Sequence, residues 1–221
     1  MKRSQVNEIL RDGDAFIKSF GQILPPFAYW SPEELRSASA ETIRARGMGW
    51  DITDYGQGKF DELGLFLFTT RNGVVEDIAN GRGMLYAEKV MITRENQLSP
   101  MHRHDLKAED IINAGGGELI IELFAPDEDL NIDRNAKVTV PCDGIEKTFE
   151  PGGHLRLMPG ESVTLMPGVW HAFWAEKGDC LIREVSTVND DHIDNIFEEP
   201  IGRFSEIEED EAPLRLLVSD Y

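Results

Sequence analysis

The sequence holds 221 residues, of which 41% are hydrophobic, which is enough for one well-formed core but includes no run apolar enough to span a membrane. The formal net charge of −19 argues against nucleic acid and anionic membrane surfaces as partners, because both reward clustered Lys and Arg. No secretory signal is recognisable at the start, and Cys142 and Cys180 lack any ligand or redox spacing, so we expect a cytoplasmic protein with reduced thiols.

Residues 1–48 are predicted to form helices that pack on the rest of the chain. From Ser4 to Phe20, apolar residues recur with the 3.6-residue period of an amphipathic helix, although Gly13 weakens the pattern. The sequence Ser31-Pro32-Glu33-Glu34 matches a capping box, with serine as the N-cap and proline at the first helical position. It predicts a second helix that runs to about Arg46.

Residues 49–188 are predicted to form a barrel or sandwich of short strands. Runs of β-forming residues follow one another at close intervals and are separated by Gly-containing turns. Asn72-Gly73 and Asp143-Gly144 are typical of hairpin turns, and the glycines at 115–117 predict a turn from which the chain returns as a strand. The expected strands are 64–70, 85–94, 118–124, 137–140, 145–149, 155–158, 162–166, 172–175 and 180–186.

Residues 189–221 are expected to cover the barrel or a dimer interface. Between residues 184 and 221 there are twelve Asp or Glu and two Lys or Arg, a bias that by default indicates a solvated face. The apolar run 214–218 is too hydrophobic to stay in solvent, so we expect it to pack on the barrel or on a second subunit. Together with the edge strands, this run favours a homodimer.

The stretch 100–117 carries the residues that point most directly to chemistry. His102 and His104 stand two positions apart, and in a strand such residues share one face. With the carboxylate of Glu109, the two imidazoles form an incomplete metal site. His154 and His192 have no such partners by spacing, and we expect both to be structural or surface residues.

Two segments resemble the paired motifs of the cupin superfamily. The matching positions are His102, His104, Glu109 and Gly116 in the first motif and Gly160, Gly168 and His171 in the second, with Met166 and Ala175 as departures. The resemblance implies an all-β cupin fold, a double-stranded β-helix or jelly-roll barrel, with His171 completing the ligand set. Three neutral imidazoles and one carboxylate leave positions open on Mn²⁺, Fe²⁺, Co²⁺, Ni²⁺ or Zn²⁺, and they exclude a closed structural zinc site.

Longer strings, at 25–34, 49–58, 109–117, 184–191 and 200–204, resemble the D-lyxose isomerase family and cover nearly the whole chain. Members of that family are cupin-type aldose–ketose isomerases that use a divalent metal, typically Mn²⁺. The resemblance implies interconversion of D-lyxose and D-xylulose, with D-mannose and D-fructose as further substrates, by proton transfer through an enediol.

Such a reaction needs a base that moves a proton between C1 and C2 of the sugar. Glu184 is the first choice, because inward residues near His171 should reach the barrel lumen and because it resembles the proton-transfer Glu of related cupin isomerases; the alternative is that it faces solvent. Lys107 is the second choice, to hold a hydroxyl or protonate an oxygen, unless it is solvated. The residues expected to bind the sugar are Asp190, Asp191, Arg203 and Trp174; the alternatives are a simple solvated tail for the first three and core packing for the tryptophan.

Two other functions stay open on the sequence alone. A cupin dioxygenase would use the same ligands with Fe²⁺ and O₂, and it would not need a lumen carboxylate or lysine for proton transfer. A non-catalytic cupin would only bind a sugar or pack against a partner. The overall acidity fits a small neutral sugar better than a phosphorylated one.

Overall fold

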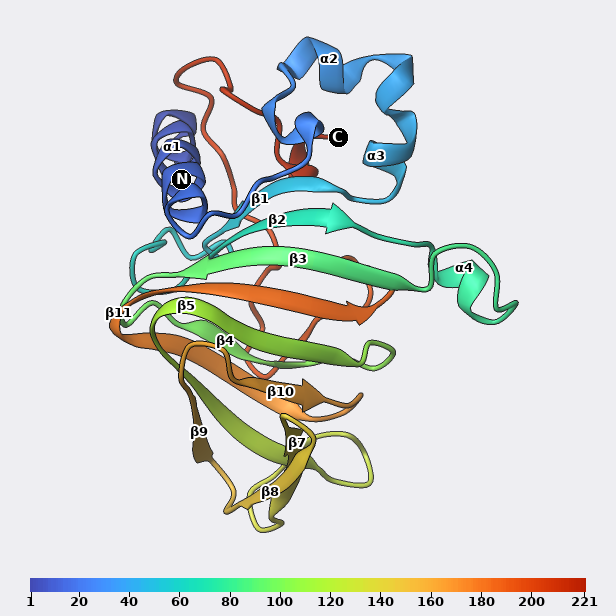
Figure 1. The fold of residues 1–221 in the computed structure, drawn as a ribbon, viewed down its shortest axis with the longest axis vertical. Helices are drawn as coiled ribbons and strands as arrows, with labels where there is room; N and C mark the ends of the chain where they lie inside the picture. The colour runs from blue at the N-terminus through green and yellow to red at the C-terminus, as the bar shows by residue number, and fades with distance from the viewer.

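A curled β-sheet forms the body of the molecule (Figure 1). The computed structural model describes every residue from Met1 to Tyr221. Strands β1, β2, β3, β11, β4 and β12 follow one another in the sheet, β5 pairs with β11, β10, β9 and β6, and β7 and β8 form a separate hairpin. The strands are β1 (Gly49–Thr53), β2 (Leu65–Arg71), β3 (Tyr86–Thr93), β4 (Ser99–Arg103), β5 (Glu109–Pro126), β6 (Ile132–Asp133), β7 (Val138–Cys142), β8 (Ile145–Phe149), β9 (Gly153–Leu157), β10 (Ser162–Leu165), β11 (Trp170–Thr187) and β12 (Ile196–Phe197). The predicted all-β cupin class, with N-terminal helices and a C-terminal extension, is confirmed.

Two long strands, β5 and β11, of 18 residues each, run antiparallel along one another. The turn predicted at 115–117 is wrong, because β5 continues through these glycines without reversing. At two of them β11 passes very close: a Cβ added to Gly116 would clash with the backbone oxygen of Asp179, and one added to Gly117 with those of Glu176 and Gly178. Gly116 and Gly117 therefore allow the two strands to approach, and β5 stays uninterrupted.

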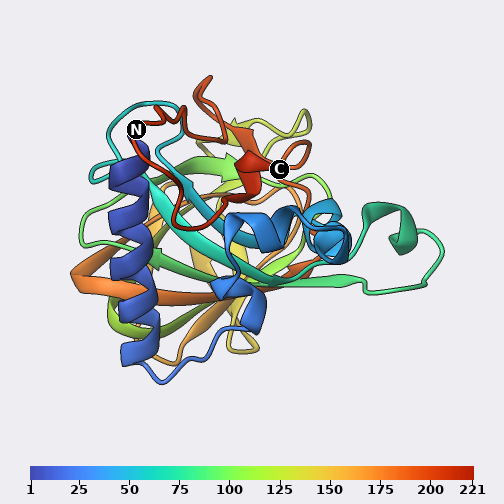
Figure 2. The same cartoon turned by 90° about the horizontal axis from the view of Figure 1, so that it is seen from above.

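Helices α1, α2 and α3 lie on one side of the sheet, where α1 runs across its outer face, whereas α4 projects beyond the ends of β2 and β3 (Figures 1 and 2). The helices are α1 (Arg3–Ser19), η1 (Pro26–Tyr29), α2 (Pro32–Arg36), η2 (Ala38–Ala40), α3 (Glu41–Ala45), α4 (Val75–Ile78) and η3 (Val218–Asp220). Gly13 of α1 packs directly on the ring of Phe66, so the residue that weakens the helix on propensity allows it to approach the sheet. None of these helices has the length and apolarity that a membrane span requires.

The second predicted helix is interrupted. The capping box at Ser31 and Glu34 is present, but the chain leaves the helix at Ser37, whose backbone is extended with ψ of 161°. Arg44 donates to the carbonyl oxygens of Leu35 and Ser37 and so stabilises the break. The uninterrupted helix predicted to Arg46 is therefore wrong.

The two predicted hairpin turns have different outcomes. At Asp143 and Gly144 both φ angles are positive, 50° and 81°, and β7 pairs with β8 as expected. At Asn72-Gly73 there is no tight turn, because β2 and β3 are joined by a longer connection that contains α4. The buried Asn72 side chain instead donates to the backbone oxygens of Arg46 and Asn189, which ties three distant segments together.

The C-terminal segment returns to the N-terminal helices and lies between α1 and the α2–α3 layer (Figures 1 and 2). The apolar run 214–218 packs on its own chain: Leu216 is buried beside Leu35, and Leu217 beside Trp50. Its acidic residues are also engaged, since Arg3 of α1 pairs with carboxylates near the end of the chain. The segment is therefore part of the folded body.

Candidate active site

A small cavity of about 40 Å³ lies inside the barrel and collects the residues that the motifs pointed to. Its wall comes from β3, β4, β5 and β11 and from the segment that follows β11. The titratable residues on the wall are Tyr55, Lys89, His102, His104, Lys107, Glu109, His171, Glu184, Asp191 and Arg203. The cavity is therefore polar at one end of an otherwise apolar barrel core.

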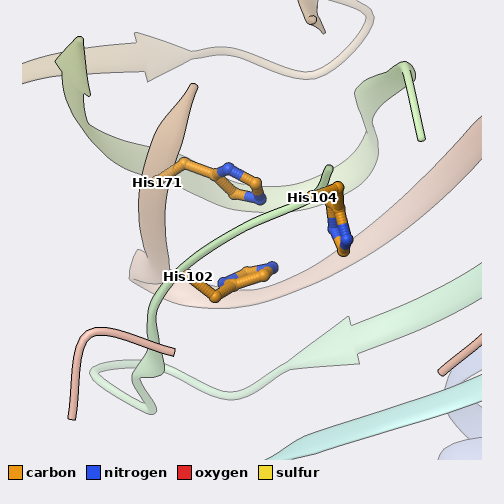
Figure 3. A group of neighbouring side chains, drawn as sticks. All are labelled: His102, His104 and His171. Atoms are coloured by element: carbon orange, nitrogen blue, oxygen red, sulfur yellow. The ribbon is translucent and has the colours of Figure 1, made fainter. Parts of the chain in front are cut away.

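Three histidines converge in this cavity (Figure 3). His102 on β4 and His171 on β11 are register partners across the two strands, and His104 follows directly after β4. One ring nitrogen of each lies within 4.8 Å of those of the others. The expected i, i+2 arrangement of His102 and His104 thus meets a third imidazole from a strand nearly 70 residues later in the chain.

Backbone carbonyls fix the orientation of all three imidazoles. The Nδ1 atoms contact the oxygens of Pro100 at 2.8 Å for His102, of Val169 at 3.1 Å for His171, and of Asp194 for His104. A carbonyl can only accept, so each Nδ1 carries the proton and each Nε2 is left with its lone pair. This is the arrangement that second-shell partners impose on metal-binding histidines.

The surroundings also keep the imidazoles of His102 and His104 neutral. Burial, followed by the neighbouring His171, lowers the pKa of His102 well below its ordinary value. Burial, followed by the charge of Lys107, lowers the pKa of His104 to about 3. Two of the nitrogen donors are therefore deprotonated at any ordinary pH, which is the form that binds metal.

Glu109 begins β5 and faces the histidines. Its Oε1 lies 3.1 Å from Nε2 of His171 and 3.6 Å from Nε2 of His104, while its Oε2 lies 2.6 Å from Nζ of Lys107. Burial alone would raise the pKa of Glu109, but the charge of Lys107 and the nearby histidines hold it well below its ordinary value. The carboxylate is thus ionised, with one oxygen turned toward the imidazoles.

Glu184 reaches the cavity because β11 contains an irregularity. Before it, His171, Phe173 and Ala175 face inward; after it, the inward residues are Cys180, Ile182 and Glu184. The register with β5 shifts between Glu176 and Cys180, and Lys177 adopts a positive φ of 60°. An uninterrupted strand would place positions 171 and 184 on opposite faces, since side chains alternate with period two. The two separate strands predicted at 172–175 and 180–186 are therefore parts of the single strand β11, which contains a bulge.

Lys107 lies between the candidate metal ligand Glu109 and Glu184 and contacts both. It is 3% exposed, and its Nζ lies 2.6 Å from Oε2 of Glu109 and 3.1 Å from Oε1 of Glu184. Burial would lower the pKa of this ammonium group, but the two carboxylates outweigh burial and raise it. The cavity therefore contains a protonated lysine between two buried carboxylates.

Sequence reasoning missed two charged residues of the site. Lys89 on β3 is 3% exposed, and its Nζ lies 3.5 Å from Oε1 of Glu184 and donates to Oδ1 of Asn189 at 2.7 Å. Asp51 on β1 is also buried, and its Oδ2 lies 2.9 Å from Nη2 of Arg203. A charged residue inside an otherwise apolar strand was the available signal in both cases.

Arg203 and Asp191 come from the segment after β11 and close this end of the cavity. Nη2 of Arg203 lies 3.0 Å from Oδ2 of Asp191, whose other oxygen accepts from Asn195. Burial would raise the pKa of Asp191, but Arg203 and Lys89 hold it well below its ordinary value. Nη1 of Arg203 and both carboxylate oxygens of Asp51 have no hydrogen-bond partner.

Two of the predicted sugar-binding residues are not brought to this cavity. Trp174 lies on the opposite strand face from His171, against the ring of His154 and with its indole nitrogen bonded to Glu176. Asp190 lines a separate cavity of about 280 Å³ near α3 and accepts from the backbone of His192. This placement gives no support to a sugar contact for either residue.

The donor set fits a divalent metal ion. Nε2 of His171 is buried without a hydrogen-bond partner, because its 3.1 Å contact with Glu109 lacks hydrogen-bond geometry. A divalent ion would fill the space that the lone pairs face.

Comparison with known proteins gives a consistent picture. A family model described as D-lyxose isomerase matches residues 1–221. The D-lyxose/D-mannose isomerases of Serratia proteamaculans and Escherichia coli O157:H7 are 46% and 43% identical over 226 residues, which cover 100% of this chain and 98% of each relative. Among solved structures, the L-ribose isomerases of Cellulomonas parahominis and Acinetobacter sp. DL28 superpose with a TM-score of 0.62 over 94% of this chain and 98% of theirs, at 16% and 15% identity, and so share its fold. As its motifs predict, the chain belongs to the D-lyxose isomerase family.

Proposed function

We propose that this protein is a divalent-metal-dependent aldose–ketose isomerase that interconverts D-lyxose with D-xylulose and D-mannose with D-fructose. The names of its relatives support the substrates. The observation that carries the proposal is that one buried cavity holds three converging imidazoles and Glu109 directly beside the Lys107–Glu184 pair. The first group suits a metal ion and the second suits proton transfer.

His102, His104, His171 and Glu109 would hold the ion, and Mn²⁺ is our first choice, with Co²⁺, Fe²⁺, Ni²⁺ or Zn²⁺ as alternatives. When bound, such an ion supplies Lewis-acid polarisation of a sugar carbonyl and its neighbouring hydroxyl. The histidines contribute fixed tautomers, so little reorganisation is needed at the donor atoms.

Glu184 is proposed to act as the base. Its carboxylate takes the proton from C2 of the aldose, so that the electron pair of the C2–H bond forms the C1–C2 double bond of the enediol and the carbonyl oxygen O1 takes a proton from Lys107. The carboxyl group then returns its proton to C1, while the hydroxyl at C2 gives its proton back to Lys107 and becomes the carbonyl of the ketose. Lys107 donates to the sugar oxygen that gains negative charge, and it also holds the Glu184 carboxylate in place at 3.1 Å. Lys89 contacts the same carboxylate oxygen at 3.5 Å.

Asp191 and Arg203 are proposed to bind the hydroxyls of the sugar. Arg203 has an unpaired Nη1, and a polar group in that state gains free energy when a ligand hydroxyl pairs with it.

The proposal is tested by incubating the Mn²⁺-loaded protein with a panel of aldopentoses and aldohexoses in D₂O under nitrogen, and following C1 and C2 by NMR. We expect ketose from D-lyxose and D-mannose, with solvent deuterium at C1 or C2. Turnover that needs O₂ would identify a dioxygenase instead. Binding without turnover of any aldose would leave a sugar-binding cupin and refute the isomerase.

A further inference from the structure

Asp194 makes an unusual set of contacts with the loop that carries the candidate metal ligands. Its Oδ1 accepts from the backbone N–H of Asp105 at 2.7 Å and of Leu106 at 3.0 Å, and its Oδ2 accepts from that of Lys107 at 2.9 Å. One carboxylate thus satisfies three successive N–H groups of a loop that forms no strand. The side chain is buried, so these bonds are shielded from water.

The same residue also orients a histidine. The backbone carbonyl oxygen of Asp194 accepts from Nδ1 of His104. Through four hydrogen bonds, a single residue fixes the backbone between β4 and β5 and the tautomer of one imidazole. Lys107 and Glu109 stand on or directly after this loop, so their side chains start from the same fixed backbone.

Asp194 is itself held in place by the backbone on either side of it. Its backbone N–H donates to the oxygen of Asp190 at 3.0 Å, and two residues later Ile196 pairs with Arg103 in the β12–β4 ladder. The segment that brings Asp191 and Arg203 over the cavity is therefore fastened to the metal-ligand loop at Asp194. In the sequence this aspartate is hidden in an acidic tail that reads as solvated.

We propose that Asp194 is a positioning residue that holds His104 and the 105–107 loop in the geometry needed for metal binding and proton transfer. This role rests on the proposed function, because it assumes that the three histidines and Glu109 hold a metal ion. Asp194 contacts neither the space between the imidazoles nor Glu184, so it acts only through the groups that it orients.

The test compares Mn²⁺ affinity, read from the EPR signal of the uncomplexed ion, in the parent protein, Asp194→Ala and Asp194→Asn. Loss of an outer-shell partner typically weakens metal binding 10–100-fold, and we expect a rise of about this size in the dissociation constant for Asp194→Ala. Asp194→Asn keeps the carbonyl oxygen that can serve Asp105 and Leu106 but offers no acceptor to Lys107, so its dissociation constant should fall between the two. With saturating Mn²⁺, the kcat for D-lyxose should recover in part.

Asp127→Asn is the matched control. The carboxylate of Asp127 also accepts from two backbone N–H groups, those of Asp129 at 2.9 Å and Asn131 at 2.8 Å, but on a loop outside the cavity. Its Mn²⁺ dissociation constant should stay within about twofold of the parent value. Should Asp194→Ala fail to fold, Asp194→Asn decides the question on its own.

The outcomes separate this role from the proposed function. If the parent binds Mn²⁺ and isomerises D-lyxose while both Asp194 variants bind Mn²⁺ within twofold of it, the positioning role is refuted and the isomerase stands. If the parent binds Mn²⁺ without turning over any aldose and the variants bind it more weakly, the positioning role stands and the isomerase is refuted. If the parent binds no divalent ion, both are refuted.

Discussion

The carboxylate of Glu184 sits between two ammonium groups, with Lys107 at 3.1 Å and Lys89 at 3.5 Å from the same oxygen. Both lysines are almost fully buried, so their charges act at short range in a medium that screens them little. Their contacts hold the carboxylate in one orientation beside the imidazole cluster. The proposed base is thus oriented before substrate arrives, as proton transfer requires.

Replacing Glu184 with Gln tests its role. The amide keeps the shape but cannot take a proton, so kcat should fall by about 10²- to 10⁴-fold, the range that general base catalysis contributes. Mn²⁺ affinity should change little, because Glu184 is not among the proposed ligands. Glu176→Gln, on the outer face of the same strand, should keep parental kinetics. Full activity in Glu184→Gln would rule out this base.

The pKa of His104 makes the metal-free protein sensitive to acid. Burial, followed by the charge of Lys107, lowers this pKa to about 3, whereas an unfolded His titrates near pH 6.5. Below pH 6.5 the unfolded chain therefore binds a proton that the native state does not, and stability is lost progressively as pH falls toward 3. Between pH 7 and pH 5 this residue alone should account for about 2 kcal/mol.

Urea unfolding of the metal-free protein at pH 7 and pH 5 measures this loss of stability. His104→Gln should reduce the difference between the two pH values, while His154→Gln, at an exposed position, should leave it unchanged. An identical pH difference in the parent and in His104→Gln would contradict the assignment.

At the scale of elements, the irregularity in β11 decides which side chains enter the cavity. It lies opposite the glycines of β5, where the backbones approach so closely that Gly117 cannot carry a Cβ without displacing its neighbours. The bulge and the glycines are therefore one feature, and it turns Glu184 to the same side as His171. For this reason one strand, β11, brings both the candidate ligand His171 and the proposed base to the cavity.

Gly117→Ala tests this coupling. The methyl group would press on the backbone of β11 at Glu176 and Gly178, and overpacking of this kind typically costs about 1–3 kcal/mol. We expect a lower urea midpoint and reduced kcat, since a displaced bulge also displaces Glu184. Gly21→Asn is the comparison, at a position with φ of 72° and no atom within 4 Å, and it should be nearly neutral. If Gly117→Ala changes neither the urea midpoint nor kcat, β11 accommodates the methyl group and the proposed coupling is wrong.

Local backbone geometry was enough to predict that His102 and His104 share a face and that residues 49–188 form short strands, while the resemblance to the cupin motifs supplied His171 and the fold class. Reasoning from the residues alone failed where the outcome depends on contacts between distant segments. The glycines at 115–117 read as a turn because nothing local reveals the approach of β11. Lys89 and Asp51 were missed because their partners are more than 90 residues away in the chain.

At the scale of the whole molecule, the acidic C-terminal segment joins the N-terminal helix to the cavity. Asp194 and Asp191 reach the site, while Glu209 and Asp220 pair with Arg3, whose side chain is 2% exposed. These four carboxylates are paired within the fold, whereas others of the segment, among them Glu198, Glu199 and Glu206, are exposed to solvent. The apolar residues near its end add to the same attachment by packing beside Trp50.

Arg3→Ala should loosen this attachment. The buried guanidinium holds two carboxylates, and its removal leaves both without their cation; since Glu209 is 56% exposed, we expect a loss of about 1–3 kcal/mol in urea unfolding. Arg11→Ala, at an exposed position on the same helix, provides the control and should change stability by less than about 0.5 kcal/mol. Equal stability of the two variants would mean that the pairing of Arg3 contributes nothing measurable.

The central claim is that the imidazole cluster holds a metal ion that the isomerisation requires. It is tested most directly by the rate of D-xylulose formation from D-lyxose under nitrogen, before and after removal of metal with a chelator and again after addition of Mn²⁺. We predict that chelation abolishes ketose formation and that Mn²⁺ restores it, in the parent but not in His102→Ala. Ketose formation that continues unchanged after complete metal removal would contradict the account.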